Sequence, residues 1–163
     1  MNYNTNPYES QNPYEAPAVD SYEMNTQSNV RTAGTGGGDF VEFMGKINEI
    51  NHELDTYEQL INSVDTYHKR LLAEVNEDQE LQLRRTLDDI VSQASDLQYQ
   101  LKSKIKSAQQ AGLHDASKQA QAENSRQRFL KAIQDYRIIE SNYKEENKEQ
   151  AMRQYRVVQP DAT

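Results

Sequence analysis

The 163-residue sequence contains no cysteine and no tryptophan. Without cysteine the chain forms no disulfide, presents no thiolate nucleophile and offers no sulfur ligand to zinc. Its three histidines, His52, His68 and His114, never lie three or four residues apart, which is the spacing that a helical metal site needs. Paired catalytic carboxylates and a phosphate-binding glycine loop are also missing. We therefore predict no catalytic residue, no metal ligand and no cofactor.

The chain is also poor in apolar residues and in positive charge. Hydrophobic residues make up only 35% of it, and 18 Lys and Arg stand against 26 Asp and Glu, for a net charge of -8. This balance disfavours nucleic acid and anionic membrane surfaces, because both require a basic face. No apolar run is long enough to span a bilayer, and no secretory signal is recognisable, so we expect a soluble chain.

The composition changes sharply near Asp39. Residues 1–38 hold three of the four prolines, four of the six glycines and a single basic residue, Arg31. Such a segment cannot bury enough apolar surface to offset the conformational entropy lost on ordering. We predict a disordered tail over residues 1–38.

A short unit occurs twice within this tail. The sequence Asn-Pro-Tyr-Glu stands at residues 6–9 and again at residues 12–15. Proline fixes its own φ and favours an extended residue before it, so each tyrosine loses little further entropy when it docks. Two weak copies on one chain raise each other's effective concentration at a partner surface. The alternative is a chance recurrence in a biased segment. The candidate binding residues are Asn6, Pro7, Tyr8, Asn12, Pro13 and Tyr14.

Three helical patterns follow the tail. Apolar residues recur at alternating spacings of four and three from Phe43 to Val75, again from Leu83 to Ala108, and more weakly from Ala122 to Tyr143. These are the heptad stripes of helices that pack in a bundle. We expect helices at about 39–75, 77–111 and 115–155, with residues 156–163 beginning a linker.

Residues with capping preferences separate the three patterns. Asp39 and Asn76 suit the starts of the first and second helices, and Asp115 or Ser117 suits the start of the third. Gly112 is expected to end the second helix in a left-handed conformation. Because short loops allow only antiparallel neighbours, the sequence predicts an all-α fold: an antiparallel up-down-up three-helix bundle over residues 39–155, behind the tail.

The third pattern is interrupted by polar residues. Arg126, Glu140 and Asn147 occupy its heptad positions, so part of this face is expected to meet solvent or another helix. Ile138 projects roughly opposite the stripe. A basic cluster on this helix fits an acidic helix or is simply solvated. The cluster comprises Arg126, Arg128, Lys131 and Arg137.

Several runs carry a family resemblance. Residues 118–130 read KQAQAENSRQRFL, residues 134–139 read QDYRII, residues 141–146 read SNYKEE, and residues 159–163 read QPDAT. Together they closely resemble the fungal plasma-membrane syntaxins of the Sso type. The resemblance runs from the tail to the last residue.

This resemblance implies an N-terminal peptide followed by the three-helix domain called Habc. Syntaxins continue into a SNARE helix and a C-terminal membrane anchor, and this chain is similar only to the parts before them. In the family, Habc folds back on the SNARE helix and slows assembly. The implied place for that helix is the groove between the second and third helices. Candidate lining residues are Arg84, Asp88, Arg126, Lys131, Arg137 and Ile138.

The resemblance also implies partners and a location. The implied partners are the protein's own SNARE motif, SNAP-25-like and vesicle SNAREs, an SM-family regulator and, through the tail, an exocyst tethering subunit. The full-length protein is expected at the cytosolic face of the plasma membrane, and residues 1–163 alone are expected to be cytosolic. A generic helical-bundle adaptor unrelated to SNAREs would share the heptads but not the quoted runs. A membrane-bending domain would need a concave basic face.

Overall fold

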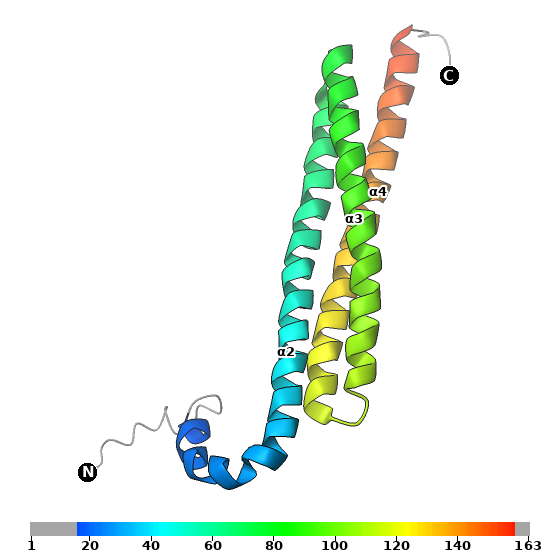
Figure 1. Cartoon of the computed structure of the whole chain (residues 1–163). Helices are drawn as coiled ribbons and strands as arrows, with labels where there is room; N and C mark the ends of the chain where they lie inside the picture. Colours follow the sequence, from blue (N-terminus) through cyan, green and yellow to red (C-terminus); the bar gives the residue numbers. More distant parts are fainter. Residues whose placement is uncertain (1–15, 159–163) are drawn as a thin grey trace, which may run out of the picture. The chain divides into compact units, whose positions relative to one another are not determined.

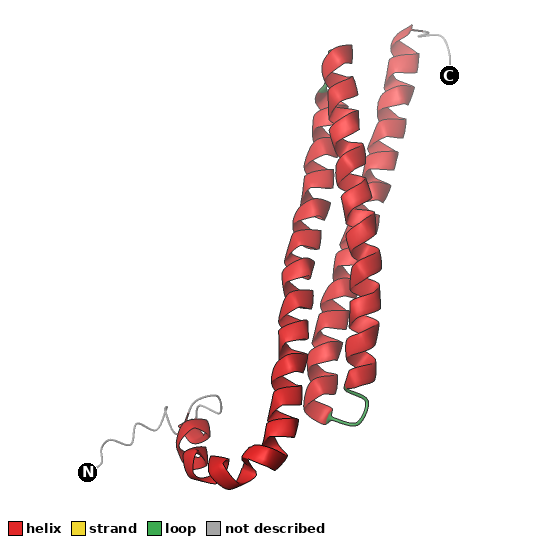
Figure 2. Ribbon diagram, in the orientation of Figure 1, coloured by secondary structure: helices red, strands yellow, loops and turns green. Residues whose placement is uncertain are grey.

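The computed structural model describes residues 16–158, with side chains described for residues 37–157. Contacts divide the chain into two compact units, Met1–Gly45 and Lys46–Thr163. The described elements are three α-helices, named α2, α3 and α4, and no strand occurs within them (Figures 1 and 2). In the second unit the three helices run side by side and alternate in direction (Figure 1). The predicted all-α three-helix fold is confirmed.

Helix α2 spans Ala16–Ala73 and is longer than expected. It begins before Asp39 and so takes in residues that their composition assigned to the tail. Pro17 lies in its first turn, where a missing N–H leaves no helical hydrogen bond unmade. At the other end, Val75 was expected to close the apolar stripe, but it lies beyond the helix and is 93% exposed. The Glu74 carboxylate instead accepts from the Val75 N–H at 3.1 Å and so shapes the loop.

Helix α3 spans Glu77–Ala111, the range that the sequence predicted. Asn76 is its N-cap: its backbone is extended, and its side-chain oxygen accepts from the Gln79 N–H at 3.1 Å. Three acidic residues follow in the first turn, where negative charge suits the helix dipole. This cap requires an extended Asn76, which explains why α2 cannot continue through Val75.

Gly112 ends α3, but not in the conformation that we predicted. Its φ is -98° and its ψ is 9°, a region open to any residue. The need for glycine is one of space, because a Cβ here would lie 3.0 Å from the Lys118 Cβ and 3.1 Å from the Gln119 nitrogen. Gly112 therefore permits the close return of the chain into α4.

Helix α4 spans Ala116–Val158, and Asp115 caps it. The Asp115 carboxylate accepts from the backbone N–H groups of Ser117 and Lys118 at 2.9 and 3.2 Å. Of the two N-caps considered, Asp115 is therefore correct. The buried apolar face of α4 ends at Ile139. Every residue from 140 to 157 is exposed except Tyr143 and Gln150, which are half-buried.

The core of the second unit follows the predicted stripes. Its centre is in α2, where Leu54, Tyr57 and Val64 are completely buried. The α4 side is built from smaller residues than expected, because Ser125 and Ala132 are buried beside Phe129. The buried residues of α2 and α3 in this unit are Ile47, Ile50, Leu54, Tyr57, Ile61, Val64, His68, Leu71, Leu87, Ala94, Leu101, Ile105 and Ala108.

Candidate docking surface

Helix α2 is fastened to both of its neighbours by ion pairs. Lys104 of α3 lies 2.7 Å from the Glu49 carboxylate and also contacts Glu53. These contacts raise the pKa of the Lys104 ammonium, chiefly through its hydrogen bond to Glu49. On the other side, Arg128 of α4 lies 2.8 Å from the Glu58 carboxylate. Four acidic residues of α2 are therefore paired with cations of its neighbours: Glu49, Glu53, Asp55 and Glu58.

Tyr57 joins all three helices from inside the bundle. Its side chain is fully buried, its hydroxyl donates to the Gln98 Oε1 at 2.6 Å, and its ring lies 5.9 Å from that of Phe129. Burial raises the pKa of Tyr57 to about 12, and the charge of Arg137 opposes that rise. Gln98 belongs to α3 and Phe129 to α4. The side chain of Tyr57 therefore lies at the inner side of the line of contact between α3 and α4, which we call the seam.

The seam between α3 and α4 differs from the two edges of α2, because apolar contacts dominate it. Leu87 is buried there, and Val91, Tyr136 and Ile139 pack partly buried around the same cluster. One polar interaction crosses the seam, because the Tyr143 hydroxyl acts electrostatically on Arg84, whose hydrogen bond is to Glu80 on its own helix at 2.9 Å. The hydrogen bond to Glu80, and to a smaller extent Tyr143, raise the pKa of the Arg84 guanidinium.

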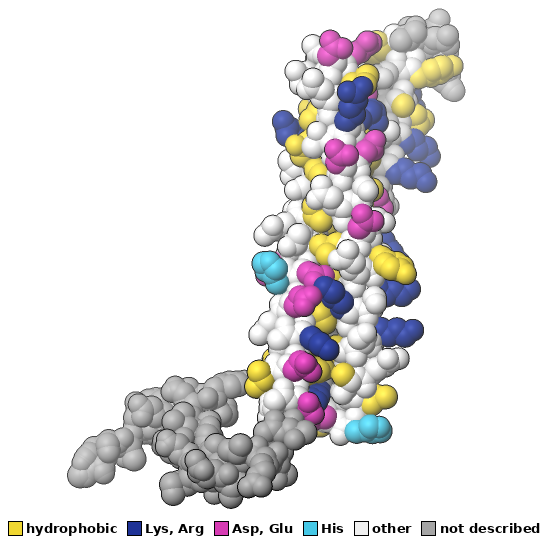
Figure 3. Space-filling model, in the orientation of Figure 1, with side chains coloured by type: hydrophobic (Ala, Val, Ile, Leu, Met, Phe, Trp, Pro, Cys, Tyr) yellow, Lys and Arg dark blue, Asp and Glu magenta, His cyan; other side chains and the backbone are white. Residues whose placement is uncertain are grey.

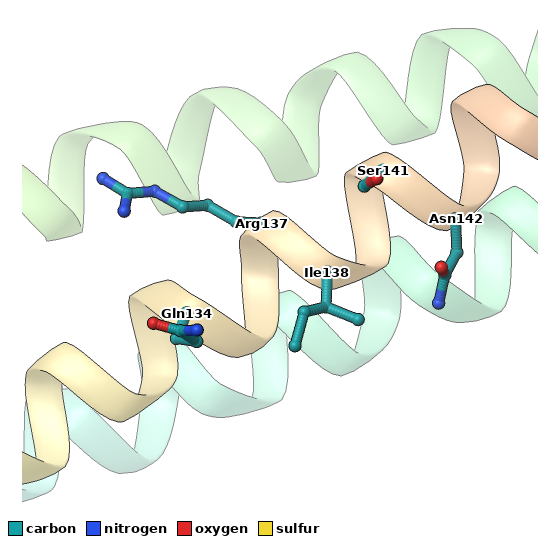
Figure 4. A pocket seen from close by; sticks show the side chains of 5 residues that line it. All are labelled: Gln134, Arg137, Ile138, Ser141 and Asn142. Carbon is teal, nitrogen blue, oxygen red and sulfur yellow. The ribbon is translucent and has the colours of Figure 1, made fainter.

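The structure brings three of the six predicted groove residues to this seam. Arg84 contacts Tyr143, and the Arg137 side chain extends towards α3 (Figure 4). Arg126 shares the face of α4 that carries Arg137, because eleven residues make slightly more than three full turns. Arg126 lies 3.0 Å from Glu123 of its own helix, whereas Arg137 has no ion-pair partner within the described residues.

Of the other three residues, Lys131 lies apart from that surface, so the groove with all six lining residues stays a prediction. Lys131 faces the α2 side, where it lines a hollow of about 240 Å³ with Glu58 and Asn62. Ile138 is 50% exposed and shares with Arg137 an open depression of about 340 Å³ whose described lining comes from α4 alone (Figure 4). Asp88 is exposed and follows Arg84 by one helical turn, so it shares the flank of α3 that carries Arg84. Sequence order alone does not say which flank of α4 meets α3, so it could not separate Lys131 from the other residues.

A further cation was missed by the sequence analysis. Lys144 follows Arg137 by seven residues, so both share one face of α4, and Lys144 is likewise exposed with no ion pair in the described part of the chain. Seven-residue spacing was the signal that could have found it. Helix α4 carries nine Lys and Arg against six Asp and Glu, although the whole chain has a net charge of -8. Figure 3 shows Lys and Arg gathering along one edge of the bundle.

The remaining predictions concern the tail motif, a metal site and a membrane span. The tail residues Asn6, Pro7, Tyr8, Asn12, Pro13 and Tyr14 lie outside the described residues. Within residues that are described, no three His, Cys, Asp or Glu side chains come together as a metal ion would require. None of the helices, over the same residues, has an apolar stretch long enough to cross a membrane.

Comparison with known proteins gives three relatives. No protein-family model matches the chain. It is 60% identical to Protein SSO2 of Saccharomyces cerevisiae over 98% of its length, and 60% identical to Protein SSO1 of the same yeast over 100% of its length. It is 41% identical to Protein transport protein SSO2 of Candida albicans over 98% of its length.

These alignments cover 54%, 54% and 55% of the three relatives, so the chain spans about half the length of the curated relatives it matches. The two yeast relatives are syntaxins, which are SNARE proteins and not enzymes. The chain is thus similar along almost its whole length to the Sso proteins, and its resemblance to the fungal plasma-membrane syntaxins is confirmed.

Proposed function

We propose that this chain is the N-terminal regulatory region of a plasma-membrane syntaxin that acts in exocytosis. In this proposal the surface along the α3–α4 seam docks the protein's own SNARE helix and so slows assembly with SNAP-25-like and vesicle SNAREs. The full-length protein would lie at the cytosolic face of the plasma membrane, where an SM-family regulator would act on it. The 60% identity to the two yeast Sso proteins supports this assignment.

One observation carries the docking part of the proposal: the seam has exposed cations that the bundle itself does not pair. The edges of α2 are closed by ion pairs of Lys104 and Arg128, whereas Arg137 and Lys144 have no ion-pair partner within the described residues. Beside them, Leu130 is 44% exposed, on the same flank of α4. A helix with acidic residues flanking an apolar stripe would match this surface.

The experiment is a titration of the full 163-residue chain with the separately produced SNARE helix, followed by calorimetry and amide NMR shifts. The variant Arg137→Glu with Lys144→Glu reverses two charges at the seam. We expect about tenfold weaker binding, because each exposed pair contributes roughly 0.5–1 kcal/mol, and we expect the difference to shrink in high salt.

A matched control reverses two exposed cations away from the seam. Lys69→Glu with Lys131→Glu makes the same change in net charge, but both lysines pair with an acid one turn away on their own helix. The control should bind like the unmodified chain. Equal weakening by both variants would mean that net charge, and not the seam, governs binding.

The tail part of the proposal assigns the two Asn-Pro-Tyr units to a folded domain of an exocyst subunit. Tyr8 and Tyr14 would be the anchors, since tyrosine buries a large area and has only two side-chain torsions to fix. The variant Tyr8→Ala with Tyr14→Ala should abolish binding of that subunit, whereas Tyr3→Ala, outside both units, should not. Unchanged affinity in the double variant would contradict this assignment.

A further inference from the structure

His68 occupies an unusual position between α2 and α4. Only 7% of it is exposed, and its ring stacks on that of Tyr143 with centroids 3.9 Å apart and planes 9° from parallel. Its Nδ1 atom is buried and has no hydrogen-bond partner within the described protein. A neutral imidazole tolerates this surrounding, because one of its nitrogens carries no proton.

Tyr143 is also one of very few points that hold the C-terminal segment of α4, residues 140–157, on the bundle. Within this segment only Tyr143 and Gln150 are not exposed. Gln150 donates to the Leu72 carbonyl oxygen at 3.1 Å, and Tyr143 contacts His68 on one helix and Arg84 on another. The stack between His68 and Tyr143 is therefore a main fastening of this segment.

A proton on His68 would act against that fastening. The imidazolium would place an N–H donor in a buried site without an acceptor, which disfavours the packed arrangement. Asp65 on α2 is the charged group that acts on the ring, and it favours the protonated form; Arg84 of α3 acts on Tyr143, the stacking partner of His68. The balance lowers the pKa of His68 below its ordinary value of 6.5, chiefly because of burial.

We propose that His68 is a proton-sensitive latch: the neutral ring holds Tyr143, and with it residues 140–157 of α4, against the bundle, and protonation releases that segment. The closed form binds the proton less tightly than the released form, so release is absent above pH 6.5 and grows as the pH falls below it. For each unit by which closure lowers the pKa, full protonation raises the ratio of released to closed form by about tenfold.

The movement of the latch does not require the proposed docking of the SNARE helix. If that docking occurs, the latch would regulate it. Residues 140–157 include Lys144 and border the α3–α4 seam, so their release would remove part of the proposed docking surface. That consequence rests on the proposed function, whereas the movement itself can be measured on the isolated chain. Failure of one is therefore distinguishable from failure of the other.

The absence of cysteine makes the test direct, because two introduced cysteines carry the only spin labels. One pair, Gln82→Cys with Lys148→Cys, spans α3 and the C-terminal segment of α4 at exposed positions. A second pair, Lys102→Cys with Gln127→Cys, reports on the opposite end of the same two helices. Distance distributions for the full chain are compared between about pH 7.5 and pH 5.5, on either side of the ordinary histidine pKa.

We expect the first pair to gain a longer and broader distance population at the lower pH, and the second pair to stay unchanged. His68→Phe keeps an aromatic stack but cannot titrate, and it should abolish the response. His68→Gln is also neutral throughout, and it serves as a second non-titrating variant in case phenylalanine packs poorly at this position. The proposal is overturned if the first pair does not respond, if both pairs respond alike, or if the response persists in both variants.

Discussion

Tyr57 offers the sharpest test of how the bundle is held together, because its ring and its hydroxyl can be examined separately. Tyr57→Phe removes only the hydroxyl that donates to the Gln98 Oε1 at 2.6 Å, and leaves the ring against Phe129. A hydrogen bond of this kind contributes about 1 kcal/mol net, since water competes for both groups in the unfolded chain. We expect the variant to lose about that much of the free energy of unfolding near neutral pH, with the helical content unchanged.

The pH dependence of the same variant adds an independent check. Burial raises the pKa of Tyr57 to about 12, above its ordinary value of 10, so the folded chain holds the phenolic proton more tightly than the unfolded chain does. The stabilisation is therefore complete below pH 10 and is lost as the pH rises towards 12. The difference in stability between the unmodified chain and Tyr57→Phe should shrink across that range, because phenylalanine does not titrate.

Urea denaturation monitored by circular dichroism at about pH 7 and again at about pH 10.5 measures both effects, with the slope of the transition as a check on two-state behaviour. Tyr99→Phe is the matched control, because Tyr99 is 78% exposed and its hydroxyl faces water. A loss for Tyr57→Phe no larger than for Tyr99→Phe would refute the view that the hydroxyl ties α2 to α3. A difference that grows with alkaline pH would refute the sign of the pKa shift.

Three further changes test the termini and edges of the helices, each by the shift in urea midpoint. Asn76→Ala removes the cap of α3 and should lower stability by about 1 kcal/mol. Arg128→Ala breaks the ion pairs to α2 and should cost up to about 1 kcal/mol in low salt and less in high salt, whereas Arg126→Ala, within one helix, should change stability by a few tenths at most. Gly112→Ala should destabilise through the 3.0 Å approach to the next helix, whereas Gly45→Ala, with nothing within 4 Å of its Cβ, should stabilise by about 0.5–1 kcal/mol.

The sequence was most informative where a helix end depends on one local interaction. Asn76 and Asp115 act through their own side chains on backbone N–H groups two or three residues away, so the cap is readable without tertiary structure. The core stripes of α2 and α3 were equally readable, because burial on one helical face follows directly from heptad spacing. Val75 shows the limit: its spacing continued the stripe, but the geometry of the next cap had already ended the helix.

The candidate surface was harder to predict, because it depends on which flank of α4 meets which neighbour. Arg128, Lys131 and Arg137 fall within ten residues and form one basic cluster in the sequence. In the fold Arg128 pairs with α2, Lys131 lines a hollow beside α2, and only Arg137 turns towards α3. Heptad spacing gives the buried face of a helix but not the handedness with which three helices assemble, so it cannot divide the remaining face between two neighbours.

The polar interruptions of the third stripe have an energetic consequence that the fold makes specific. An apolar side chain the size of leucine contributes roughly 1.5–3 kcal/mol when fully buried. After Ile139, α4 has no such buried side chain among its described residues, because only Tyr143 and Gln150 are even half-buried. Residues 140–157 are therefore held more weakly than the rest of the bundle and should open locally before it unfolds. Such a segment can be displaced or released by a modest change in free energy, such as the protonation of one buried ring. The weakest stretch of the heptad pattern is thus the part of the bundle best suited to regulation.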